Sequence, residues 1–152
     1  MKQLEKFLKI GTILSVFLLI ASVLLQIFAR FFLTQAPPWT EEVSRLFFIF
    51  SVAFASPLAL KTNYFIYLDV FYNLMSRDWK ERINIFILIT TFLMFLILAF
   101  TSVKFVMMGM VEKSPSMGVK MSLAFSSMFI LAIAICYFIG VKLIKLYKKT
   151  KA

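Results

Sequence analysis

The side chains best suited to chemistry lie together at the start of an apolar segment. Two carboxylates, Glu41 and Glu42, and the guanidinium of Arg45 immediately precede the uncharged run 46–60. Glu41 and Arg45 are four residues apart in the acid-first order, so we expect an ion pair on one helix face. Glu42 has only Leu46 at the corresponding position, which leaves its carboxylate free for a contact with another subunit. Neighbouring carboxylates project about 100° apart on a helix, so they do not form a general acid/base pair.

The composition of the chain indicates that its solvent is lipid. Of the 152 residues, 62% are hydrophobic, and the mean hydropathy is +0.93. The uncharged runs 10–29, 83–103 and 121–141 are each about 30 Å long as helices, enough to cross the hydrocarbon core of a bilayer. We therefore predict an all-α integral membrane protein, a single domain over residues 1–152. Its four transmembrane helices are expected at about 8–29, 41–61, 83–104 and 121–142.

The distribution of charge predicts how the chain is oriented. Lysines and arginines give the net charge of +10, and they gather at the ends of the predicted spans. With the amino terminus in the cytoplasm, twelve of them face inward and five face outward, which is the asymmetry of the positive-inside rule. Both termini are therefore expected to be cytoplasmic. Basic span ends suit anionic headgroups, so we expect contact with the lipid bilayer and none with nucleic acid.

Residues 64–80, between the second and third spans, have the pattern of an amphipathic helix. Its apolar face comprises Phe65, Leu68, Tyr72, Met75 and Trp79, and its polar face comprises Asp69, Asn73, Ser76 and Lys80. We expect this helix to lie in the membrane interface. The alternative is a longer, tilted second span that runs through Asp69. Trp79 and Lys80 would anchor the segment, as Lys145, Lys148 and Lys149 would anchor the end of the last span.

The residue types predict a protein that is not an enzyme and that holds no cofactor or metal of its own. The chain contains no histidine and seven acidic residues, and its one cysteine, Cys136, lies in mid-span. An exporter driven by protons would need an acidic residue in mid-membrane, and the four uncharged runs contain none. The residues thus favour a chain that completes another membrane protein. The alternative is a self-contained small four-helix transporter or exporter.

The segment around the two carboxylates also resembles a known family. Trp39-Thr40-Glu41-Glu42-Val43-Ser44-Arg45, followed by a short phenylalanine-rich span, is similar to the small membrane (DctQ-like) subunit of tripartite ATP-independent periplasmic (TRAP) transporters. The resemblance continues through Ile66-Tyr67-Leu68-Asp69 and through the segment 114–119, with its proline and glycine. Many members carry histidine one residue before that isoleucine, where this chain has Phe65.

The resemblance implies a non-catalytic subunit of the bacterial inner membrane. Such subunits bind and brace a large TRAP membrane subunit, which holds the substrate and sodium sites. A periplasmic substrate-binding protein delivers an organic acid, for example a dicarboxylate or sialic acid. The residues expected at the interface with the partner subunit are Trp39, Glu41, Glu42, Arg45 and Asp69.

Overall fold

Four long helices make up the fold in the computed structural model, which describes residues 2–33, 37–61 and 76–150. They are α1 (Lys2–Phe32), α2 (Trp39–Lys61), α4 (Arg77–Met108) and α5 (Ser122–Thr150). Each is long and apolar enough to cross a membrane. The predicted all-helical fold with four apolar helices is therefore confirmed for the described part of the chain.

The structure does not test most of the predicted interfacial helix over 64–80. Residues 62–75, including Asp69, lie outside the described residues. Trp79 and Lys80, expected near the end of that helix, instead belong to the first turns of α4, which Ser76 precedes as N-cap. The correction has a local reason: no proline or glycine separates Arg77 from the apolar run, so the helix propagates from one into the other.

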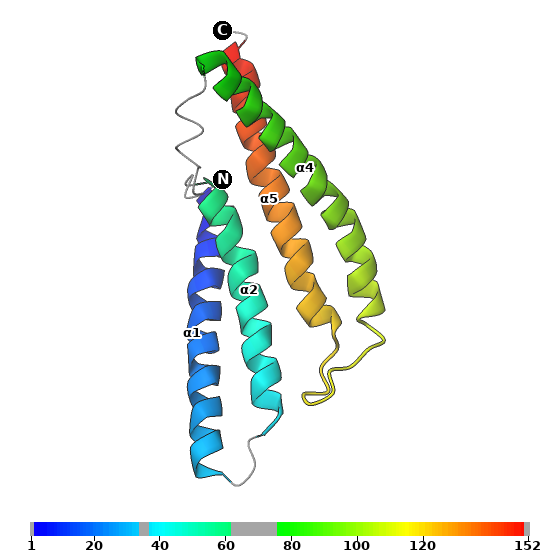
Figure 1. Cartoon of the computed structure of the whole chain (residues 1–152). Coiled ribbons are helices and arrows are strands. Elements are labelled where there is room, and N and C mark those ends of the chain that lie inside the picture. The colour runs from blue at the N-terminus through cyan, green and yellow to red at the C-terminus, as the bar shows by residue number, and fades with distance from the viewer. Residues whose placement is uncertain (1, 34–36, 62–75, 151–152) are drawn as a thin grey trace.

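The helices stand side by side in the order α1, α2, α5, α4 (Figure 1). The pairs that pack together are α1 with α2, α2 with α5, and α4 with α5. Along the helix axes the molecule has two ends. The one called here the terminal end holds the start of α1 and the end of α5. The opposite end, called here the hairpin end, holds the loop 109–121 between α4 and α5. The row has two central helices, α2 and α5, and two edge helices, α1 and α4.

Small residues let α1 lie close to α2. The buried positions of α1 are Leu8, Ser15, Ser22 and Ala29, which recur every seven residues. A seven-residue repeat keeps one face of a helix against its neighbour, and small side chains allow close approach of helices in lipid. The Ser22 hydroxyl donates to the Leu19 carbonyl within α1 at 2.8 Å, so its burial leaves no donor unsatisfied.

Two apolar clusters hold the centre of the row. Leu8 of α1, Phe54 of α2, and Ala134 and Phe138 of α5 form the first. The second joins α4 to α5 and comprises Leu88, Ile135 and Ile139. The first cluster packs α2 against α5 in the half of the row nearer the terminal end.

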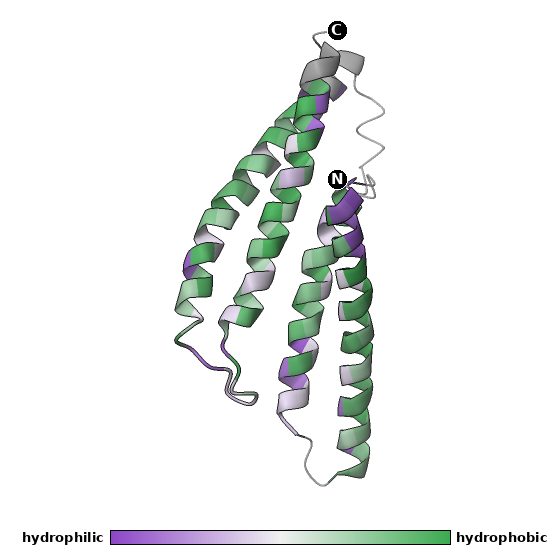
Figure 2. Cartoon of the chain, turned by 180° about the vertical axis from the view of Figure 1, so that it is seen from behind, coloured by the Kyte–Doolittle hydropathy of each residue, from purple (hydrophilic) through white to green (hydrophobic). Residues whose placement is uncertain are grey.

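Much of the remaining apolar surface is exposed. Phe31 in α1 and Phe100 in α4 are 81% and 71% exposed, respectively. Figure 2 shows hydrophilic residues toward the two ends of the helices, with apolar stretches between them. Exposed apolar area on this scale marks a surface that lipid or another protein covers.

Candidate functional site

The ion pair predicted at the start of α2 is present. The Arg45 guanidinium donates a hydrogen bond from Nη2 to Glu41 Oε1, four residues earlier on the same helix face. Both side chains are exposed, at 76% and 56%, and exposed ion pairs contribute little to stability. Trp39, at the first position of α2, is also exposed. These groups are thus available at the surface of the hairpin end.

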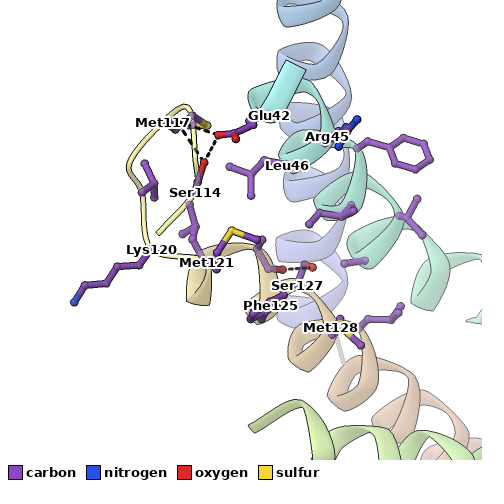
Figure 3. A pocket seen from close by; sticks show the side chains of 18 of the residues that line it. Glu42, Arg45, Leu46, Ser114, Met117, Lys120, Met121, Phe125, Ser127 and Met128 are labelled. Carbon is purple, nitrogen blue, oxygen red and sulfur yellow. Dashed lines mark hydrogen bonds between the residues drawn. The ribbon is translucent and has the colours of Figure 1, made fainter. Parts of the chain in front are cut away.

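Glu42 has partners within its own chain, so the expectation that its carboxylate is free is wrong. It accepts a hydrogen bond from the Ser114 hydroxyl, one from the Ser116 backbone N–H at 3.1 Å and one from the Met117 N–H at 3.0 Å. Figure 3 shows the Glu42 carboxylate directed at Ser114 and Met117. The carboxylate therefore joins the start of α2 to the loop between α4 and α5.

The loop 109–121 presents two neighbouring backbone donors to the Glu42 carboxylate. Ser114 N–H donates to the Val119 carbonyl at 2.8 Å, and Gly118 N–H donates to the Ser114 carbonyl at 3.0 Å. Gly118 has a φ of 66°, a left-handed conformation that favours glycine. The resulting turn presents the successive N–H groups of Ser116 and Met117, an arrangement that binds anions. In this structure the bound anion is the Glu42 carboxylate.

A groove of about 690 Å³ lies beside this contact, between α2 and α5. Its α2 wall includes Leu46, Ile49, Val52 and Ala53, and its opposite wall includes Met117, Met121, Phe125, Met128 and Leu131. Charged residues (Glu42, Arg45 and Lys120) line it only toward the hairpin end. The groove is thus an apolar space with Glu42 and Arg45 near its mouth, and the Lys120 ammonium is directed away from it (Figure 3).

The remaining predicted residues lie apart from this contact. Trp79 is exposed near the start of α4, and Lys145 is exposed near the end of α5, both toward the terminal end. Lys148 and Lys149 belong to the helical backbone of α5, and their side chains lie outside the described residues. The structure does not bring these groups to Glu42, and Asp69 lies outside the described part of the chain.

Sequence reasoning missed a second polar contact, at the terminal end. Lys61, the last residue of α2, donates to Glu5 in the first turns of α1, and Lys9 lies 3.3 Å from the same carboxylate. The available signal was that Glu5 and Lys61 carry opposite charges on span ends predicted to share one side of the membrane. For Ser114 and Met117 the signal was weaker, because the segment 114–119 only indicated a turn.

Four apolar helices with charges near their ends define a multi-pass membrane protein. A family model described as "Tripartite ATP-independent periplasmic transporters, DctQ component" matches residues 19–149. The chain therefore belongs to this family of transporter components, and the resemblance seen around Trp39–Arg45 is confirmed. It is also 21% identical over 149 residues to a Haemophilus influenzae protein named as a TRAP transporter small permease protein. That match covers 98% of this chain and 90% of the relative.

Proposed function

We propose that this chain is the non-catalytic small subunit that binds and braces the large membrane subunit of a TRAP importer. The complete importer would be sodium-coupled and would take an organic acid, such as a dicarboxylate or sialic acid, from a periplasmic binding protein. The sodium and substrate sites would belong to the large subunit. The chain would lie in the bacterial inner membrane with both termini in the cytoplasm.

The arrangement of the helices in one row is the observation that carries this proposal. Membrane transport sites are built from side chains that face the interior of a helix bundle or a water-filled cavity. Here α1 and α4 stand at opposite edges of the row, and only 11% and 6% of their most apolar windows are buried. A row of this kind suits the enlargement of a neighbouring protein better than the enclosure of a substrate.

The exposed groups at the start of α2 support a contact at the hairpin end. Trp39 and Arg45 are exposed there, and Trp and Arg are among the residue types enriched at protein interfaces. Glu41 would act with Arg45, because the two already form an ion pair. Glu42 would act indirectly, by fixing the loop 109–121 beside the same surface. Asp69 stays a proposed contact on the strength of its sequence position.

Co-purification tests the proposal. A double variant, Trp39→Ala/Arg45→Ala, is expected to retain several-fold less tagged large subunit than the unmodified chain. Arg30→Ala is the matched control, since Arg30 is an exposed arginine in the last turn of α1 at the same end of the row. Equal retention by the double variant would exclude this surface as the interface. Carboxylate flux into liposomes that contain only this chain would instead support a self-contained transporter.

A further inference from the structure

We propose that the groove between α2 and α5 binds one phospholipid of the outer leaflet. Its acyl chains would lie along the apolar walls, and its phosphate would lie beside Arg45. The inference shares Arg45 with the proposed contact to a large subunit, but its test measures retained lipid and not the retained subunit.

The walls of the groove have the chemistry of an acyl-chain site. The α2 wall presents Leu46, Ile49 and Val52, and three methionines, Met117, Met121 and Met128, line the opposite side. Methionine side chains are unbranched and flexible, so they adapt to an irregular apolar guest. An empty groove would lack the dispersion contacts that its walls make when an acyl chain fills it.

The depth of the groove fits one leaflet. Along α2 its lining extends from Glu42 to Ala53, which is about 16 Å at 1.5 Å per residue, and along α5 from Met121 to Leu131, about 15 Å. Half of a hydrocarbon core of about 30 Å has the same depth. The groove therefore begins at one membrane surface and ends near the bilayer midplane.

On the side of the groove toward the terminal end, α2 and α5 pack against each other. Phe54 packs with Ala134 and Phe138, and Phe50 and Ile130 are packed against the same cluster. A transmembrane helix of a partner would need a channel along the full thickness of the membrane, about 20 residues long. An acyl chain that enters from one leaflet needs only the open half.

The charges at the mouth suit a phosphate. Glu41 accepts one hydrogen bond from Arg45, and a guanidinium has five N–H donors, so others can reach a phosphate. Lys120 also belongs to the lining, but its ammonium is directed away from the groove (Figure 3), so Arg45 is the basic group assigned to the phosphate. The nearest carboxylate in the lining, Glu42, is already bonded to the loop. Basic side chains at the headgroup level attract phospholipid phosphates.

Native mass spectrometry tests the site on the full chain, purified in mild detergent with the subunits that accompany it. The unmodified protein is expected to retain one phospholipid per copy of this chain. Val52→Trp places a bulky side chain in the groove and is expected to lower the retained fraction by about tenfold. Ile13→Trp is the control, because Ile13 lies on an exposed face of α1, away from the groove, and it should retain the lipid. Equal retention by Val52→Trp would overturn the proposal.

A second pair of measurements covers the case in which Val52→Trp fails to fold. Arg45→Gln changes an exposed side chain only, and it is expected to lower retention about tenfold through lost charge-assisted hydrogen bonds. Unchanged retention in this variant would overturn the assigned phosphate position. A photoreactive amino acid at Ile49 should form its crosslink with phospholipid. A crosslink to a peptide would show that a protein segment fills the groove, and would also overturn the proposal.

Discussion

Two adjacent glutamates in this chain do different work because their side chains leave the helix in different directions. Glu41 pairs with Arg45 on the surface of α2. Glu42, one residue later, turns to the loop between α4 and α5 and accepts three hydrogen bonds there. The first glutamate is thus available to a neighbour, whereas the second organises its own chain.

Removal of the Glu42 carboxylate should loosen the loop. In Glu42→Ala the Ser116 N–H loses its acceptor and the Met117 N–H keeps only the Ser114 hydroxyl, at 3.3 Å, so we expect their amide hydrogen exchange to accelerate by roughly tenfold. Glu41→Ala, which changes the neighbouring exposed carboxylate, should leave that exchange unaltered. Hydrogen exchange read by mass spectrometry on peptides that cover the loop makes the comparison. Equal protection in both variants would contradict the role assigned to Glu42.

The local part of this site could be predicted, and the distant part could not. The Glu41–Arg45 pair follows from four-residue spacing on one helix, which is visible in the sequence. Glu42 and its donors are 72 to 75 residues apart, and no periodicity connects them. A charged group at a helix end can be satisfied by any loop that folds back onto it, and the spacing along one helix does not reveal such a partner.

At the scale of elements, the loop 109–121 depends on a close approach at its base. A Cβ atom added at Gly109 would lie 2.5 Å from the Ser122 backbone nitrogen and 2.6 Å from the Phe125 ring. The Ser122 N–H also donates to the Gly109 carbonyl at 2.9 Å. Backbone cannot move aside as a flexible side chain can, so the start of α5 needs glycine at this position.

Gly109→Ala should therefore destabilise the α4–α5 pair by about 1–3 kcal/mol, the usual cost of overpacking. Gly140→Ala is the matched control, because its added Cβ would meet only the Phe92 ring, at 3.8 Å, an ordinary contact. Thermal unfolding in detergent, followed by circular dichroism, compares the two variants. A Gly109→Ala protein as stable as Gly140→Ala would show that the base of the loop can relax.

The four apolar helices could be predicted because hydropathy over 20 residues is a strong signal. The start of α4 was harder to predict, because Trp79 and Lys80 fit both an interfacial helix and the start of a span. The order of the helices in the row was not predicted. Periodicity within a span shows which face is buried but not which neighbour buries it, as the seven-residue repeat from Leu8 to Ala29 illustrates.

At the scale of the whole molecule, the two ends of the row should face opposite sides of the membrane. In a Cys136→Ser background, Pro115→Cys places a thiol on the loop at the hairpin end, and Gln3→Cys places one at the terminal end; both positions are exposed. With cytoplasmic termini, a membrane-impermeant maleimide should label Pro115→Cys in cells with a permeabilised outer membrane. It should label Gln3→Cys only after lysis. The reverse pattern would invert the proposed orientation.

The contact between Glu42 and the loop also has a consequence for how the protein is made. Helices α1 and α2 leave the ribosome first, and their packing involves residues close in sequence. The three donors to Glu42 lie in the loop that precedes the last helix, so they are synthesised much later. Long-range contacts generally form late, because a long loop must close first. The Glu42 carboxylate therefore gains its three hydrogen bonds only once α4 and α5 have packed against α1 and α2. In a truncated chain that ends before Ser114, the carboxylate would lack these bonds.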